Sequence, residues 1–235
     1  MKILLIIPAY NEEKNLPSVL TSLKQNCPQC DILVVDDCSN DGTRKVCKNV
    51  NVNVVSLPVN LGIGGAVQTG YKYANYFGYD IAIQVDGDGQ HNSEYINELI
   101  VKISDGVDLC IGSRFIEKQG FQSTALRRVG INYFSKLIKI LSKKLITDPT
   151  SGFRACNRKV IECFAKEYPT DYPEPETVVF ICKKDFSICE IPVIMNDRAE
   201  GKSSITKIKS IYYLIKVSIA IIIASISSNR GVKHE

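Results

Sequence analysis

Apolar residues gather in short, nearly continuous runs, and longer segments with helical spacing separate these runs. The runs lie at 3–7, 31–36, 52–57, 81–85, 107–112 and 186–195. Isoleucine, valine and leucine fill most of them, which is typical of strands buried on both faces of a sheet. The segments between them place apolar residues three and four apart, as in the stretch 127–145. This alternation predicts an α/β fold with a mostly parallel, Rossmann-like sheet flanked by helices.

Polar clusters occur in four places where a strand is predicted to have ended, at 10–12, 36–37, 60–65 and 86–90. In doubly wound sheets the ligand binds beside the carboxyl ends of the strands, so these clusters predict a nucleotide site. The glycine-rich cluster NLGIGGA matches neither the dinucleotide fingerprint nor a P-loop, since no Gly-Lys-Ser/Thr follows it. A dinucleotide-dependent enzyme or a P-loop kinase is therefore disfavoured.

The most informative loop is the sequence DGDGQH that follows the strand at 81–85. Asp86 and Asp88 present two hard oxygen donors that leave other coordination positions open, which suits Mg²⁺ or Mn²⁺ bound to a substrate diphosphate. Gln90 or His91 would complete the coordination sphere. The structural alternative is a polar Asp/Gly turn after a strand.

Further charged residues fall in loops of the second half. Asp148 lies in a Pro-Thr-Ser-Gly turn, where a turn or capping role is the structural alternative. Asp171, Glu174 and Glu176 surround three prolines before an apolar helix, and a carboxylate there is either a helix N-terminal charge or a positioned base. The late loop NDRAEGKSSI is basic and contains glycine, which suits closure over an anion.

Composition narrows the class of protein. The 235 residues are 45% hydrophobic and 23% charged, as in one large globular domain with a short appendage. The net charge of +4 is mild, and no basic run with interleaved aromatic residues predicts nucleic-acid binding. The nine cysteines are scattered, which favours free, mostly buried thiols in a reducing compartment. The N-terminus does not resemble a signal peptide.

The last predicted element, 205–227, is strongly apolar at SIAIIIASI, but lysines interrupt its first half at Lys207, Lys209 and Lys216. We favour a helix at 206–227 that binds a membrane surface or a small membrane protein. A spanning helix and a buried core helix are the alternatives. The predicted organisation is a catalytic domain at 1–205 and an association segment at 206–235.

Seven motifs, in order, resemble the family 2 glycosyltransferases. They are IIPAYNEEKNL, DILVVDDCSNDGT, NLGIGGAVQTGYKYA, IQVDGDGQH, IGSRF, DPTSGFRACNRKVI and EIPVIMNDRAEGKSSI. The resemblance spans about residues 1–205. It is closest to the branch that contains dolichyl-phosphate mannose synthase and related bacterial polyprenyl-phosphate and cell-surface polysaccharide enzymes. It implies a GT-A fold, inversion at the sugar carbon, a nucleotide-sugar donor (UDP-, GDP- or dTDP-linked) and a divalent cation, Mg²⁺ or Mn²⁺.

The resemblance also implies roles for individual positions. The nucleobase and nucleoside of the donor would be bound by Pro8, Tyr10, Glu12 and Asp37. The ribose, the diphosphate and the metal would be bound by Asp86, Asp88 and Gln90. The phosphates of donor or acceptor would be met by Arg114, Arg128 and Arg198, together with Lys202. The catalytic general base would be Glu176, with Glu174 and Asp171 next in order.

The expected reaction is sugar transfer to a lipid-linked saccharide in cell-surface polysaccharide synthesis, at the cytoplasmic face of the membrane. The alternative acceptor is a polyprenyl phosphate, which is already ionised and needs little help from a base. Two departures from the family pattern concern the acceptor and partner: Ile63 stands where many relatives have Lys, and at most one hydrophobic helix follows the catalytic domain. A non-catalytic nucleotide-binding subunit is disfavoured because Asp86, Asp88 and Gln90 are all present.

Overall fold

The computed structural model describes residues 1–122, 124–171, 173–196 and 207–227. Within them the chain forms a seven-stranded sheet with the order β3-β2-β1-β4-β6-β5-β7. Every neighbouring pair is parallel except the two that involve β6. The strands are β1 (Ile3–Ala9), β2 (Asp31–Asp36), β3 (Asn53–Ser56), β4 (Ile81–Gln84), β5 (Leu109–Ser113), β6 (Arg154–Asn157) and β7 (Ile188–Pro192). The predicted mostly parallel α/β fold is confirmed.

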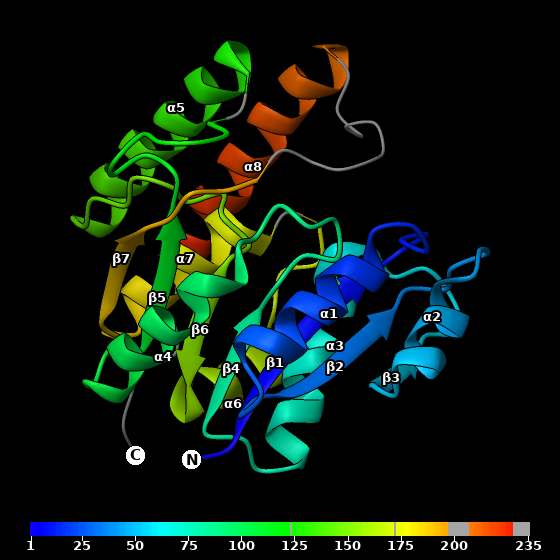
Figure 1. Cartoon of the computed structure of the whole chain (residues 1–235). Coiled ribbons are helices and arrows are strands. Elements are labelled where there is room, and N and C mark those ends of the chain that lie inside the picture. Colours follow the sequence, from blue (N-terminus) through cyan, green and yellow to red (C-terminus); the bar gives the residue numbers. More distant parts are fainter. Residues whose placement is uncertain (123, 172, 197–206, 228–235) are drawn as a thin grey trace.

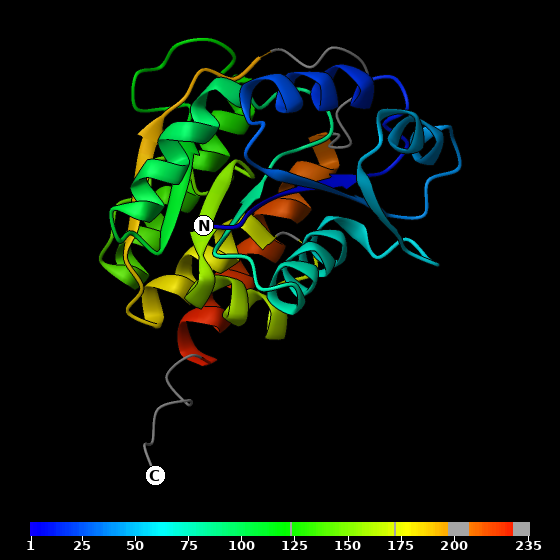
Figure 2. The same cartoon turned by 60° about the horizontal axis from the view of Figure 1, so that its bottom comes forward.

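Helices cover both faces of the sheet (Figures 1 and 2). One face is covered by α1 (Leu16–Asn26), α2 (Thr43–Val50) and α4 (Ile96–Ser104). The other is covered by α3 (Gly62–Tyr76), α6 (Arg158–Lys166) and α7 (Pro173–Lys183). Outside α7 lie α5 (Ala125–Ser142) and α8 (Lys207–Ser227), which pack against α7 and against each other.

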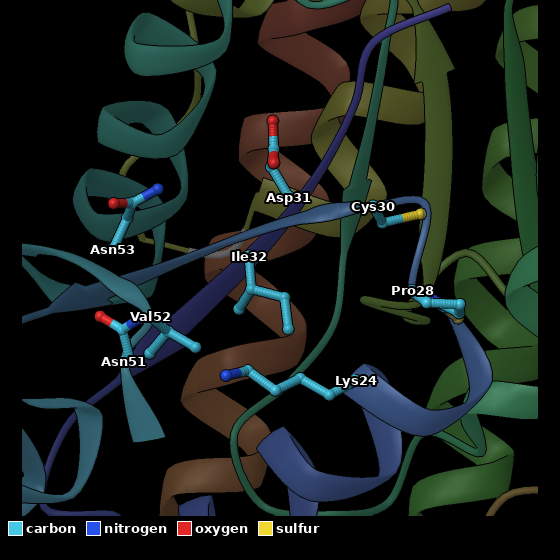
Figure 3. Close-up of a pocket in the computed structure, with 9 residues that line it drawn as sticks. Lys24, Pro28, Cys30, Asp31, Ile32, Asn51, Val52 and Asn53 are labelled. Carbon is cyan, nitrogen blue, oxygen red and sulfur yellow. The ribbon is translucent and has the colours of Figure 1, made fainter. Parts of the chain in front are cut away.

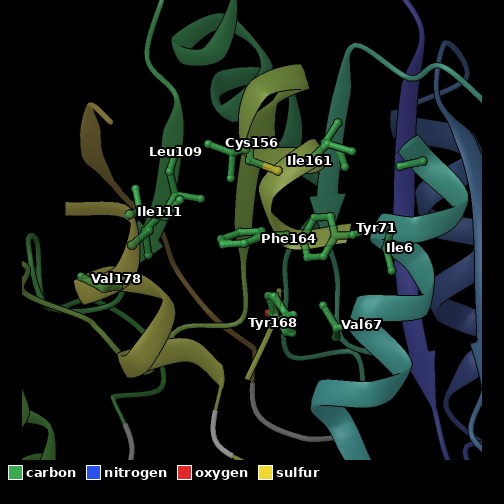
Figure 4. Packing of buried hydrophobic residues seen from close by; sticks show 14 of the residues in the cluster. Ile6, Val67, Tyr71, Leu109, Ile111, Cys156, Ile161, Phe164, Tyr168 and Val178 are labelled. Carbon is green, nitrogen blue, oxygen red and sulfur yellow. The ribbon is translucent and has the colours of Figure 1, made fainter. Parts of the chain in front are cut away.

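The core consists of two apolar clusters, one on each face of the sheet. Strand β1 contributes to both, because successive side chains of a strand point to opposite faces: Leu4 and Ile6 join one cluster, Leu5 and Ile7 the other. All seven residues of β1 are buried, which explains its unbroken apolar composition. Figure 4 shows Ile6 beside Tyr71 and the rings that pack around it.

Strand β6 is the element that the apolar pattern does not predict. It contains only four residues, Arg-Ala-Cys-Asn, so it forms no apolar run. It lies between β4 and β5 and runs against both, with Arg154 opposite Gln84 and Ile111. Because of this reversal, β6 begins at the edge of the sheet where β4 and β5 end. The turn at 148–152 is thereby brought to the edge that carries the acidic loop.

The C-terminal helix α8 has one buried side and one exposed side. Val217 and Ile221 lie in the core cluster, and Lys216 Nζ lies 2.5 Å from Asp171 Oδ2. None of the helices in the described ranges is long and apolar enough to cross a membrane, so the alternative of a spanning helix finds no support in them. The exposed side carries the isoleucines Ile215, Ile219, Ile222, Ile223 and Ile226.

Candidate active site

The acidic loop follows β4 at the edge where the parallel strands end. Asp86 and Asp88 are both half-buried. The Asp88 carboxylate accepts a hydrogen bond from the Gln90 backbone N–H at 3.1 Å, and Gly89 takes a left-handed conformation with φ of +80°. His91 is buried and accepts the Asp86 backbone N–H on Nδ1 at 3.0 Å, while its ring stacks on Phe153. The other ring nitrogen, Nε2, lies 3.5 Å from Asp86 Oδ2. Both ring nitrogens of His91 therefore face Asp86, which leaves Gln90 as the better candidate for a third metal ligand.

The turn at 148–152 forms the wall against which Asp86 lies. A Cβ atom on Gly152 would stand 3.1 and 3.2 Å from the two carboxylate oxygens of Asp86 and 2.8 Å from Gln84 Nε2. A side chain at this position would therefore require Asp86 and Gln84 to shift. Gln84 is fully buried and donates to Asp86 Oδ1 at 3.3 Å. The glycine of the Thr-Ser-Gly turn thus has a direct role in seating the first carboxylate.

Arg154 is a fully buried cation beneath this turn. Its guanidinium donates to the Ser151 carbonyl through Nε at 3.1 Å and through a second nitrogen. The remaining nitrogen donates to Thr177 Oγ1 at 2.8 Å and to the Glu174 carbonyl at 3.4 Å. Arg154 therefore ties the Asp86-facing turn to the first turn of α7. Sequence analysis missed this role, and the residue's only signal was its place directly after the Gly-Phe pair.

The two glutamates at the start of α7 have different electrostatic surroundings. Burial raises the pKa of Glu174, Asp86 raises it further, and Arg154 and Arg127 oppose that rise. Burial also raises the pKa of Glu176, but there the added effects come from Asp171 and Glu167. Residues two apart on a helix point to different sides. The charges that act on Glu174 include Asp86 of the acidic loop, whereas those that act on Glu176 belong to the segment 167–171.

Asp37 follows β2 and holds the glycine-rich turn. Its two carboxylate oxygens accept the backbone N–H groups of Leu61 at 2.7 Å and Gly62 at 2.9 Å, at the start of α3. In the same turn the Gly64 N–H donates to the Thr170 carbonyl at 3.2 Å, and a Cβ on Gly64 would stand 2.2 Å from that oxygen. The glycines thus allow α3 to approach the loop before α7. Ile63 is 40% exposed.

Arg114 follows β5 and is almost fully buried in an ion pair with Asp148. Its Nε lies 2.6 Å from Asp148 Oδ2, and a terminal nitrogen lies 2.8 Å from Oδ1. Glu190 of β7 supports the pair by accepting the backbone N–H groups of Thr147 at 2.7 Å and Asp148 at 2.9 Å. The structure therefore gives Arg114 a buried partner, and Asp148 more than a capping role.

The remaining predicted residues occupy several places. Pro8 is buried in β1, and a Cβ on Gly87 would lie 3.3 Å from its carbonyl oxygen. Tyr10 is 48% exposed, and Glu12 accepts a hydrogen bond from Asn15 at 2.7 Å. Arg128 is exposed in the first turn of α5. Arg198 and Lys202 lie outside the described residues.

The described residues contain no group of three or more His, Cys, Asp or Glu side chains that could hold a metal ion. A metal here would instead need the two carboxylates, an amide oxygen and oxygens of the substrate, which is the donor set that Mg²⁺ and Mn²⁺ prefer. A cavity of about 460 Å³ lies elsewhere, where β2 and β3 begin, and Figure 3 shows Lys24, Asp31 and Asn53 in its lining. It contains none of the predicted site residues.

Comparisons with known proteins show which family the chain resembles. The family model for glycosyl transferase family 2 matches residues 4–164. The polyprenol monophosphomannose synthase of Mycolicibacterium smegmatis is 31% identical over 222 residues, and the match covers 86% of this chain and 80% of that protein. The UDP-N-acetylglucosamine–dolichyl-phosphate N-acetylglucosaminyltransferase of Methanococcus voltae is 32% identical over 212 residues, with 81% and 84% covered.

Among solved structures, the chain is similar to glucosyl-3-phosphoglycerate synthase from Mycobacterium tuberculosis. One crystal structure of that enzyme, in complex with Mn²⁺, UDP-glucose and phosphoglyceric acid, matches with a TM-score of 0.72 and 18% identity. The match covers 95% of this chain and 79% of the other. At this identity the likeness establishes the fold.

Proposed function

This chain belongs to glycosyl transferase family 2, and from that premise we propose that it transfers a sugar from a nucleotide sugar to a polyprenyl phosphate, with inversion at the sugar carbon. The observation that carries the proposal is the meeting of three segments at one sheet edge: the acidic loop, the turn before β6 and the first turn of α7. The two relatives, whose names specify a polyprenol or dolichyl phosphate product or acceptor, favour a lipid phosphate acceptor.

Asp86, Asp88 and Gln90 would hold Mg²⁺ or Mn²⁺. The residues fit a divalent cation because both carboxylates are half-buried, and because Gly152 has no side chain to push against Asp86. Among the described residues, the buried Gln84 Oε1 has no hydrogen-bond partner, so polar capacity remains next to Asp86. A divalent cation bound there would neutralise the charge that develops on the leaving diphosphate.

The protein's own side chains would orient the donor and the acceptor. His91 and Gln84 fix Asp86, and Arg154 fixes the first turn of α7. Arg127 and Arg128 lie at the start of α5, and Arg127 is close enough to Glu174 to affect its pKa. We assign the acceptor phosphate to this end of α5, because the positive charge there would bind an anion. A phosphate that is already ionised needs no general base. The family resemblance alone suggests Arg198 and Lys202 as further phosphate-binding residues.

A lipid-linked saccharide is the second candidate acceptor, and one observation favours it. A sugar hydroxyl must lose a proton, and a general base works best when its pKa is near the pH of the reaction. Burial raises the pKa of Glu174, and the same carboxylate is influenced by Asp86. We therefore place Glu174 ahead of Glu176 and Asp171 as the base for such an acceptor. Asp171 forms an ion pair with Lys216 of α8.

We propose that the enzyme is peripheral on a membrane, with α5 and α8 facing it and 1–205 forming the catalytic domain. Ile215, Ile219, Ile222 and Ile226 form one exposed stripe at helical spacing. Neither α5 nor α8 contains an aspartate or glutamate, so their side chains offer no acidic repulsion to an anionic lipid surface. The cytoplasmic side of the membrane stays a prediction from the sequence.

The test is sugar transfer from a panel of UDP-, GDP- and dTDP-sugars, with Mg²⁺ or Mn²⁺, in the presence and absence of undecaprenyl phosphate. We expect a lipid-phosphate sugar with one donor class and loss of turnover with EDTA. Asp88→Asn should remove this turnover, whereas the exposed Asp105→Asn serves as the matched control. Metal-dependent donor hydrolysis without lipid transfer would instead support the saccharide acceptor. Metal-independent transfer would refute the metal assignment.

A further inference from the structure

Two cysteines face each other across the last two strands of the sheet. Cys110 of β5 and Cys189 of β7 are register partners, and their sulfur atoms lie 3.3 Å apart. Cys110 is fully buried, whereas Cys189 is half-buried and belongs to β7, which ends the strand order. Neighbouring strands hold paired residues at a Cα separation of about 5 Å, within the range that a disulfide needs. The register and the sulfur separation therefore place the two thiols within reach of each other.

The two thiols also differ in their exposure and in the groups around them. The contact with Cys110 lowers the pKa of Cys189, and Lys102 of α4 acts in the same direction, while burial and Glu190 oppose them. The hydrogen bond with Cys189, together with burial, raises the pKa of Cys110. The more exposed thiol of a pair reaches the oxidant first, and the buried neighbouring thiol then resolves the product. Cys189 fits the first role and Cys110 the second.

We propose that Cys110 and Cys189 form an oxidation site, at which a peroxide or a low-molecular-weight disulfide converts the two thiols into one intramolecular disulfide. With hydrogen peroxide, the Cys189 sulfur attacks one oxygen, the O–O bond breaks, and a sulfenic acid and water form. The Cys110 sulfur then attacks the oxidised sulfur and releases a second water. Two thiols lose two electrons and two protons in total, and the peroxide is reduced to two water molecules.

The site lies beside contacts that shape the candidate active site. Glu190 follows Cys189 directly and accepts the backbone N–H groups of Thr147 and Asp148. Disulfide formation would shorten the sulfur separation from 3.3 Å to about 2.05 Å. The Cys189 side chain would therefore move at the residue next to Glu190, which supports the buried Arg114–Asp148 pair. The proposal concerns the covalent change itself and does not depend on the proposed function.

The test is peroxide or oxidised-glutathione treatment of the reduced, folded full chain, followed by alkylation of remaining thiols in denaturant and mass spectrometry. We expect two fewer alkylated thiols, a loss of about 2 Da before alkylation, a cross-linked peptide pair with Cys110 and Cys189, and full reversal by dithiothreitol. Cys189→Ser should abolish the link. Cys163→Ser, a change at another half-buried thiol, should retain it.

Several results would overturn the proposal. These are a disulfide between other residues, such as Cys27 and Cys30, while Cys110 and Cys189 are still alkylated; a sulfonic acid at Cys189 with Cys110 still alkylated; and no loss of thiols under conditions that oxidise free glutathione. Because peptide mapping of the unaltered chain identifies the pair directly, the test does not depend on whether a variant folds.

Discussion

Replacing Asp148 by Asn should destabilise the fold strongly, because it leaves the Arg114 guanidinium buried without its counter-charge. The side chains of Arg114 and Asp148 are only 7% and 0% exposed, and two N–H···O contacts of 2.6 and 2.8 Å join them. Removing one partner of such a pair costs about 3–5 kcal/mol. Against a total unfolding free energy of about 5–15 kcal/mol, this is a large fraction.

Equilibrium unfolding in urea measures the effect without adding salt. With a urea m-value of about 3 kcal/mol per molar, the midpoint should fall by about 1 M or more. Glu162→Gln is the control, since the Arg158–Glu162 pair is 39% and 48% exposed and lies on one helix, so its loss should cost about 0.3–0.5 kcal/mol. Adding Arg114→Met to Asp148→Asn should recover part of the loss. Equal midpoints for Asp148→Asn and Glu162→Gln would refute the burial argument.

Three other predictions concern the site and the membrane. Glu174→Gln should lower kcat with a saccharide acceptor far more than Glu176→Gln does. Since burial raises the pKa of Glu174 above the ordinary glutamate value of 4.5, the unaltered enzyme should lose activity as the pH falls through this raised pKa. If the pH profile of kcat is the same in Glu174→Gln as in the unaltered enzyme, the assignment is wrong. Gly152→Ala should weaken Mn²⁺ activation about 10–100-fold by displacing Asp86, as titration of the metal would show, and normal activation would exclude the close contact. Ile219→Asp should reduce binding to anionic vesicles in a flotation assay while urea stability stays the same, and undiminished flotation would exclude the isoleucine stripe as the membrane face.

Most of the parallel part of the fold could be predicted because the strands β1, β2, β4 and β5 are buried on both faces. The runs at 31–36 and 81–85 correspond closely to β2 and β4, since burial on both faces requires unbroken apolar composition. Strand β6 could not be predicted in this way. It is four residues long, and its first residue, Arg154, is a charged group buried by tertiary contacts that no local pattern encodes.

The same distinction applies to the site. Asp86 and Asp88 could be placed at the sheet edge because they follow a recognisable strand. The partner of Arg114 could not be predicted from the sequence. Asp148 is 34 residues away in sequence, and the antiparallel insertion of β6 brings the two residues together. The preference for Glu174 over Glu176 likewise depends on which neighbours each carboxylate has, including Arg154 and Asp86. These roles in the site stay predictions until the variants are measured.

The strand order has a consequence for how the chain acquires its structure during synthesis. Strands β1 to β4 pair among themselves, so the half of the sheet that bears the acidic loop can assemble as soon as its residues have left the ribosome. Strand β5 has no neighbour in that half and must wait for β6 and β7. Such distant pairings slow folding. We therefore expect nascent chains that end before β6 to expose β5, and chaperones to bind them most strongly at that stage.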